Sequence, residues 1–162
     1  MRGAVWDGRE LFVTDRLDLR PVRVGEVRVR VLRSGICHTD LSMMTPHLPK
    51  LPIVLGHEAA GEVVELGDGV EGWAIGDRVA VGTQTPCGVC RECLRAEPHN
   101  CDINWGFAPN FPFLLDGAPV ASFANVSSFA GEIRVKASQL FAVDDLPPEE
   151  GALIGYAVST GV

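Results

Sequence analysis

The sequence lacks the features that mark several large classes of protein. It has no run of about 18 apolar residues, which argues against a segment that crosses a bilayer. Residues 1–12 contain no long apolar stretch behind Arg2, so no secretory signal is expected. Basic residues are not in excess, since 14 Lys and Arg stand against 21 Asp and Glu and the formal net charge is −7. These absences predict a soluble, cytoplasmic protein that binds neither a membrane nor a nucleic acid.

Long stretches of helical periodicity are scarce as well. The 18 glycines and 11 prolines are spread along the chain, which is typical of short strands joined by tight turns. Val27, Val29 and Val31 alternate with polar residues, which predicts a strand buried on one face. Further strands are expected over residues 59–66, 78–81, 128–135 and 140–143, and short helices over 38–44 and 147–158. Residues 82–121 show little periodicity and predict a loop-like excursion from a mainly β domain that spans 1–162.

Four of the five cysteines lie close together, at Cys87, Cys90, Cys93 and Cys101. In a reducing compartment, clustered cysteines indicate metal ligands before disulfides. Four thiolates form a closed tetrahedral cage, which suits structural zinc. An iron–sulfur cluster is an alternative, but in that pattern the fourth cysteine precedes proline, whereas here Asp102 follows it. The four cysteines could also be plain thiols or include a disulfide pair.

A second group of candidate ligands follows two predicted strands. Cys37 stands at the start of Cys-His-Thr-Asp, and His57 stands between Gly56 and Glu58. A cysteine and a histidine at strand ends can converge on a catalytic zinc. The alternative is that Cys37 is a small buried side chain and His57 a hydrogen-bonded polar group.

The order of these motifs resembles the zinc-dependent medium-chain alcohol dehydrogenases. The resembling segments are GICHTDL (35–41), PIVLGHEAAGEVVELG (52–67), GDRVAV (76–81), the four-cysteine segment (87–101) and GALIG…STG (151–161). The resemblance implies the N-terminal GroES-like catalytic domain without the coenzyme domain. Its fold would be a partly open β-barrel with a structural-zinc lobe over residues 82–121 and a short C-terminal helix. Residues 147–162 would begin the linker toward a Rossmann domain that the sequence does not contain.

The resemblance also implies roles for individual residues. Cys37 and His57 would ligate a catalytic zinc, with Glu58 behind the metal and able to approach it. Thr39 would pass on the proton of the alcohol, and Asp40 would orient His57. His38 would lie near the coenzyme, and Thr83 would line the substrate pocket. The implied reaction is the NAD-dependent oxidation of a primary alcohol or a thiol–aldehyde adduct, through a zinc-bound alkoxide and hydride transfer.

One departure from the family concerns the catalytic zinc. Tyr156 stands where the resemblance implies a third ligand, a cysteine. Glu58 could replace that ligand, Tyr156 could bind as a phenolate, or the site could be empty. We expect an empty or weakly occupied site, because two protein ligands hold zinc less firmly than three.

The second departure concerns the coenzyme. No Gly-x-Gly-x-x-Gly follows a strand and opens a helix, and Gly67, Gly69 and Gly72, which have that spacing, stand in a predicted turn. The 162-residue chain alone is therefore expected to be inactive, and an inactive zinc-binding module is the alternative function. An exposed sheet edge would favour a homo-oligomer. A third interpretation is a lobe that docks a partner through Phe107, Phe111 and Phe113, although these rings could equally cap the core.

Overall fold

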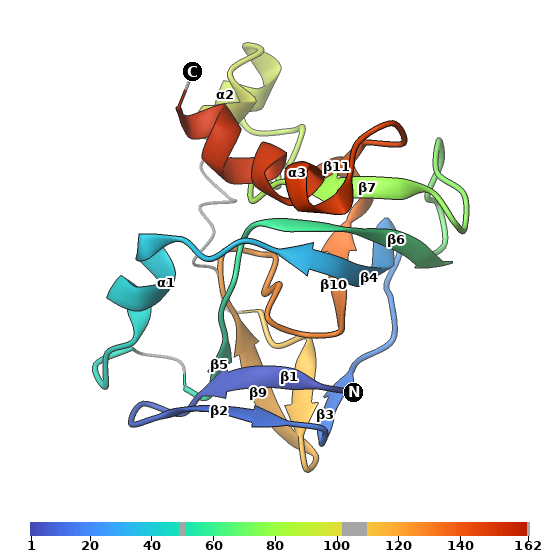
Figure 1. The fold of residues 1–162 in the computed structure, drawn as a ribbon. Coiled ribbons are helices and arrows are strands. Elements are labelled where there is room, and N and C mark those ends of the chain that lie inside the picture. The colour runs from blue at the N-terminus through green and yellow to red at the C-terminus, as the bar shows by residue number, and fades with distance from the viewer. Residues whose placement is uncertain (49–50, 102–109, 162) are drawn as a thin grey trace.

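The computed structural model describes residues 1–48, 51–101 and 110–161, which form two curled sheets (Figure 1). The six-stranded sheet has the order β2 (Leu11–Thr14), β1 (Gly3–Trp6), β5 (Ile53–Val54), β9 (Ala118–Ser122), β8 (Phe113–Leu115) and β3 (Leu17–Leu19). The five-stranded sheet has the order β10 (Glu132–Lys136), β4 (Glu26–Ser34), β6 (Ala59–Leu66), β7 (Arg78–Val81) and β11 (Leu140–Ala142). The prediction of a mainly β domain is confirmed.

Helical segments are short. They comprise α1 (His38–Met43), α2 (Arg91–Leu94), α3 (Pro148–Leu153), the 3₁₀ turns η1 (Pro98–Asn100) and η2 (Ala137–Gln139), and the π turn η3 (Ile154–Val158). The C-terminal helix α3 packs on the face of the five-stranded sheet that is turned away from the other sheet (Figure 1). There Gly151 allows the close approach, since a Cβ on it would lie 3.3 Å from the Cβ of Ala60. In the described part of the chain, no helix is long and apolar enough to cross a bilayer.

The main core lies between the two sheets. Val27 and Val29 of β4 are fully buried and pack with Phe113 of β8 and Leu17 of β3. The intervening Arg28 is half-buried and Arg30 is exposed, so the predicted period-two pattern of β4 is confirmed. Apolar burial of this kind stabilises by about 25 cal/mol per Å² of surface removed from water. The core therefore fixes the strand ends from which the candidate ligands project.

Two sequence predictions are wrong in their bounds. The expected strand over 128–135 begins only at Glu132, because the N–H groups of Ser128 and Phe129 donate to the carbonyls of Gly56 and Leu55 at 3.0 and 3.1 Å. The expected excursion over 82–121 contains β8 and β9, which pair as a hairpin within the six-stranded sheet. The turn at Asp116 and Gly117 joins them, with positive φ at both residues.

The remaining features expected along the chain can also be located. Gly69 and Gly72 have φ of +74° and +78° between β6 and β7, so the turn predicted there is confirmed. Phe113 is fully buried, which excludes it from an exposed docking patch, whereas Phe111 is 36% exposed. Phe107 lies outside the described residues. Strands β2, β3, β10 and β11 end the two sheets in the described ranges, and self-association through such an edge stays a prediction.

Candidate metal centres

The four cysteines of the lobe converge around one point. Their Sγ atoms all lie within 4.8 Å of one another. The Sγ atoms of Cys87 and Cys93 are 4.0 Å apart, and those of Cys90 and Cys101 are 3.9 Å apart. These separations exceed a disulfide bond of about 2.05 Å. They match the edges of about 3.8 Å that four sulfurs form around zinc. The donor set therefore fits one tetrahedral ion.

Local backbone geometry explains this convergence. Gly88 has φ of +74°, and the tight turn that it makes points the N–H groups of Val89 and Cys90 at Cys87 Sγ, at 3.4 and 3.2 Å. The N–H of Cys87 in turn faces Cys101 Sγ at 3.4 Å. Donors of this kind stabilise thiolates. Partial burial and the three neighbouring thiols raise the pKa of Cys93 to about 12. A bound cation would favour its thiolate, because a metal deprotonates the thiol that it binds.

Cys37, His57 and Glu58 form a second group of possible ligands. Cys37 immediately precedes α1, and the other two residues lie between β5 and β6. A thiol sulfur, a ring nitrogen and a carboxylate oxygen from these residues all lie within 4.8 Å of one another. His57 and Glu58 are only 1% and 4% exposed. The buried Nε2 of His57 has no hydrogen-bond partner in the described structure. The sequence motifs thus meet in space at one buried point.

Asp40 fixes the orientation of His57. Its Oδ1 lies 3.3 Å from His57 Nδ1 and accepts the N–H of Gly56 at 2.9 Å, while its Oδ2 accepts the N–H of Cys37 at 3.0 Å. Burial alone would raise the pKa of Asp40, but these hydrogen bonds outweigh burial and lower it. Burial would lower the pKa of His57, and the contact with Asp40 outweighs that effect and raises it. With Nδ1 bound to Asp40, Nε2 is the nitrogen left for a metal.

Thr39 lies beside the cysteine of this group. Its Oγ1 is 3.5 Å from Cys37 Sγ. The hydroxyl and the backbone N–H of Thr39 lower the pKa of the Cys37 thiol. A lowered pKa favours the thiolate, which is the form that binds metals. His38 is exposed on the first turn of α1.

Two aromatic rings contact the imidazole of His57. The ring of Tyr156 in η3 stands perpendicular to it at a centroid distance of 4.5 Å, and the ring of Phe123 does so at 5.5 Å. Phe123 could not be recognised from the sequence, because a lone phenylalanine after a short strand carries no signal of its own. Edge-to-face pairs of this kind contribute about 0.5–1.5 kcal/mol each. Tyr156 therefore contacts the second group through its ring.

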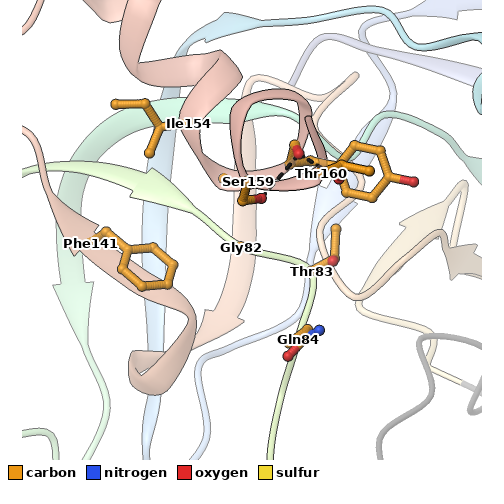
Figure 2. Close-up of a pocket in the computed structure, with 9 residues that line it drawn as sticks. Gly82, Thr83, Gln84, Phe141, Ile154, Ser159 and Thr160 are labelled. Carbon is orange, nitrogen blue, oxygen red and sulfur yellow. Dashed lines mark hydrogen bonds between the residues drawn. The ribbon is translucent and has the colours of Figure 1, made fainter. Parts of the chain in front are cut away.

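Tyr156, whose ring contacts His57, also lines a cavity of about 450 Å³. Figure 2 shows Phe141 and Thr83 on opposite sides of it, beneath the helical segment that carries Ile154 and Thr160. Gln84 and Ser159 add polar atoms to the lining, and the hydroxyls of Ser159 and Thr160 donate to the Tyr156 carbonyl at 3.0 and 2.7 Å. Thr83, expected to line a substrate pocket, lines this cavity.

We expect Asp40→Asn to weaken metal binding at the second group by about 10–100-fold, the range typical for a partner that orients a ligand. The NH₂ group of the asparagine would face one of the two backbone N–H groups whose hydrogen bonds the carboxylate now accepts. Two donors would then face each other, which should also destabilise the fold by about 1–3 kcal/mol. Titration with zinc against a chelator measures the first effect and urea unfolding the second. Ser42→Ala, on the exposed side of the same helix, serves as the control. Unchanged zinc affinity in Asp40→Asn would contradict this role of Asp40.

Comparison with known proteins identifies the family to which the chain is related. Residues 23–145 match the family described as Alcohol dehydrogenase GroES-like domain. The chain is 33% identical over 158 residues to the NDMA-dependent alcohol dehydrogenase of Amycolatopsis methanolica. It is 31% identical over 166 residues to the alcohol dehydrogenase class-3 of Caenorhabditis elegans. These alignments cover 93% and 96% of the chain but only 43% of each relative, so the chain spans less than half the length of these proteins.

Solved structures show the same likeness. The benzyl alcohol dehydrogenase from Acinetobacter calcoaceticus superposes with a TM-score of 0.86 at 29% identity, over 99% of this chain and 46% of that one. An alcohol dehydrogenase zinc-binding domain protein from Burkholderia ambifaria gives 0.81 at 32% identity, over 94% and 44%. Together with the matched residues 23–145, these findings confirm the resemblance seen in the motifs. The chain therefore belongs to the alcohol dehydrogenase family, of which it represents the GroES-like domain.

Proposed function

We propose that this domain forms the metal-binding, substrate-facing part of a zinc alcohol dehydrogenase. It would hold a structural zinc ion at the four cysteines and a second zinc ion at Cys37, His57 and Glu58. The observation that carries the proposal is the buried Nε2 of His57, which has no hydrogen-bond partner among the described residues. The ring of His57 also belongs to a group of three donors whose ligand atoms lie within 4.8 Å of one another. An unpaired buried polar atom is costly, and a metal ion would satisfy it.

The donor set suits a catalytic ion. One thiolate, one neutral imidazole and one carboxylate leave the fourth tetrahedral position open to a small molecule. Zinc bound there would supply Lewis acidity, which makes an alcohol easier to deprotonate. Of the three arrangements that Tyr156 leaves open, this geometry favours Glu58 as the third ligand. The carboxylate is buried beside the other donors, whereas the Tyr156 ring packs edge-on against His57.

The other side chains of the site have complementary roles. We propose that Thr39 takes the proton of the alcohol, since a hydroxyl both accepts and donates and this one lies 3.5 Å from Cys37 Sγ. Asp40 keeps Nε2 of His57 directed at the metal. The cavity lined by Thr83, Phe141 and Tyr156 would take the carbon skeleton of the substrate, a primary alcohol or a thiol–aldehyde adduct.

Hydride transfer requires an acceptor. We propose that this is NAD, held by the part of the relatives that the chain does not match, and that His38 faces its phosphates. Residues 147–162 would lead into that part. Residues 1–162 alone are expected to bind metal without turnover, because Gly67, Gly69 and Gly72 form a turn between strands and no other candidate for a phosphate-binding turn stands in the sequence.

A second candidate function is an inactive zinc-binding module. The observation that favours it is Tyr156, which stands at the position of the expected third ligand and whose ring is perpendicular to the His57 ring at a centroid distance of 4.5 Å. In that case only the four-cysteine lobe would bind zinc.

Zinc content per chain distinguishes the two functions. We expect two zinc ions per chain in the parent protein and one in Glu58→Ala, since loss of a ligand should weaken binding by more than the roughly 100-fold that an orienting partner contributes. Elemental analysis after dialysis against a weak chelator measures this ratio. Glu62→Ala removes a carboxylate on β6 that pairs with exposed Arg30 at 3.9 Å, and should keep both ions. One ion per chain in the parent protein would favour the inactive module.

A further inference from the structure

Gly35 occupies the junction between β4 and α1, two residues before Cys37. Its N–H donates to the carbonyl of Glu58 at 3.0 Å, so the two residues are neighbours across strand ends. A Cβ on Gly35 would overlap Oε2 of Glu58 and would lie 3.0 Å from both Cβ and Cδ of that residue. The Glu58 carboxylate thus fills the volume that any other side chain at position 35 would occupy.

The backbone does not itself require glycine at this position. Gly35 is absent from the residues with positive φ, so alanine can adopt its conformation without backbone strain. The three heavy atoms nearest to the added methyl all belong to the side chain of Glu58. The demand for glycine at this position therefore comes from the space that the carboxylate occupies.

That space lies next to the second metal group. The donor atoms of Cys37, His57 and Glu58 are within 4.8 Å of one another, whereas ligands around zinc are separated by about 3.3–3.8 Å. Binding of zinc would draw the carboxylate toward the other two donors, and a side chain at position 35 would oppose or redirect that movement. Glu58 is 4% exposed, so a displaced carboxylate would have little access to water as an alternative partner.

We propose that Gly35 is a positioning residue whose missing side chain keeps open the space from which Glu58 serves as the third metal donor. This inference rests on the proposed function of Cys37, His57 and Glu58. Gly35 would not itself bind the metal, but it would control which carboxylate oxygen of Glu58 can reach the metal.

The test measures Gly35→Ala in two backgrounds. In the parent protein we expect it to weaken binding of the second zinc ion by about 10–100-fold, as for other residues that place a ligand. In Glu58→Ala the same substitution should have no further effect, because the side chain that it displaces is gone. Zinc is titrated against a chromophoric chelator. Co²⁺ in the second site, with zinc kept in the lobe, reports the change in donor set through its visible spectrum.

Gly131→Ala is the matched control. This glycine also lacks a positive φ, and a Cβ on it would meet only the Arg2 carbonyl at 3.4 Å, an ordinary contact. If Gly35→Ala leaves the second zinc and the Co²⁺ spectrum unchanged, or costs as much in Glu58→Ala as in the parent, the positioning role is wrong while the metal site stands. If the parent protein binds only one ion, the proposed function fails and this inference fails with it. A Gly35→Ala protein that unfolds alone but folds with Glu58→Ala would support the contact.

Discussion

Replacing Cys101 with serine should empty the four-cysteine lobe and unfold it. Between Cys87 and Cys101, Cys101 is the single buried residue, so this segment has no apolar core of its own. Structural zinc contributes about 10–16 kcal/mol of apparent binding energy in zinc-finger peptides, and here it would be the main source of order. We expect the loss of one zinc ion per chain and rapid hydrogen exchange of the amides from 87 to 101. The barrel should stay folded, because its core lies between the two sheets.

The control for this variant is Cys37→Ser. It should lose the other ion and leave the exchange of the lobe amides unchanged. A Cys101→Ser protein that keeps two tightly bound ions, or whose lobe amides remain protected, would contradict a structural metal in the lobe. Elemental analysis and hydrogen exchange with mass spectrometry are sufficient for both variants.

Replacing Tyr156 with cysteine should strengthen binding of the second zinc ion by at least about 100-fold, more than an orienting partner contributes. The substitution adds a second thiolate beside Cys37, His57 and Glu58, at a position whose side chain already contacts the His57 ring. Thiolates bind zinc more strongly than oxygen donors do. The variant should also lose about 0.5–1.5 kcal/mol of stability with the ring contact. Competition with a chelator measures the affinity, and Co²⁺ charge-transfer absorption should rise with the added sulfur.

Tyr156→Phe separates the ring of this residue from its hydroxyl. Phenylalanine keeps the edge-to-face packing and removes the oxygen. Unchanged zinc affinity in this variant would show that Tyr156 acts by packing. A large loss would instead identify the phenolate as the third ligand in place of Glu58.

Local patterns were sufficient to predict part of this structure. The alternation in β4 and the cysteine spacing in the lobe each depend on residues close in sequence, so both could be predicted directly. Strands β1, β2 and β3 were missed because the turns between them, such as the one at Asp7 and Gly8, interrupt any alternation. Strands β8 and β9 were missed because they stand within a segment whose cysteines indicated a loop.

The second metal group shows a different limit. Cys37 and His57 are twenty positions apart in sequence and were associated through the resemblance to a family. No pattern in the sequence indicated that Tyr156 and Phe123 would both pack against one imidazole, because such contacts depend on how η3 and the segment after β9 are placed. The space beside Gly35 is likewise a property of two strand ends meeting, since the glycine alone could equally have marked a turn.

The π turn η3 has a consequence for the shape of the cavity. A π turn accommodates one residue more than the α-helical turns around it, and each residue of an α-helix advances the direction of the side chains by about 100°. The extra residue therefore sets the rotational phase of the helix end, which directs Tyr156 at His57 and places Ser159 and Thr160 along the cavity. Insertion or deletion of one residue in η3 would rotate the end of the helix. Different side chains would then line the cavity, although the rest of the sequence was unchanged.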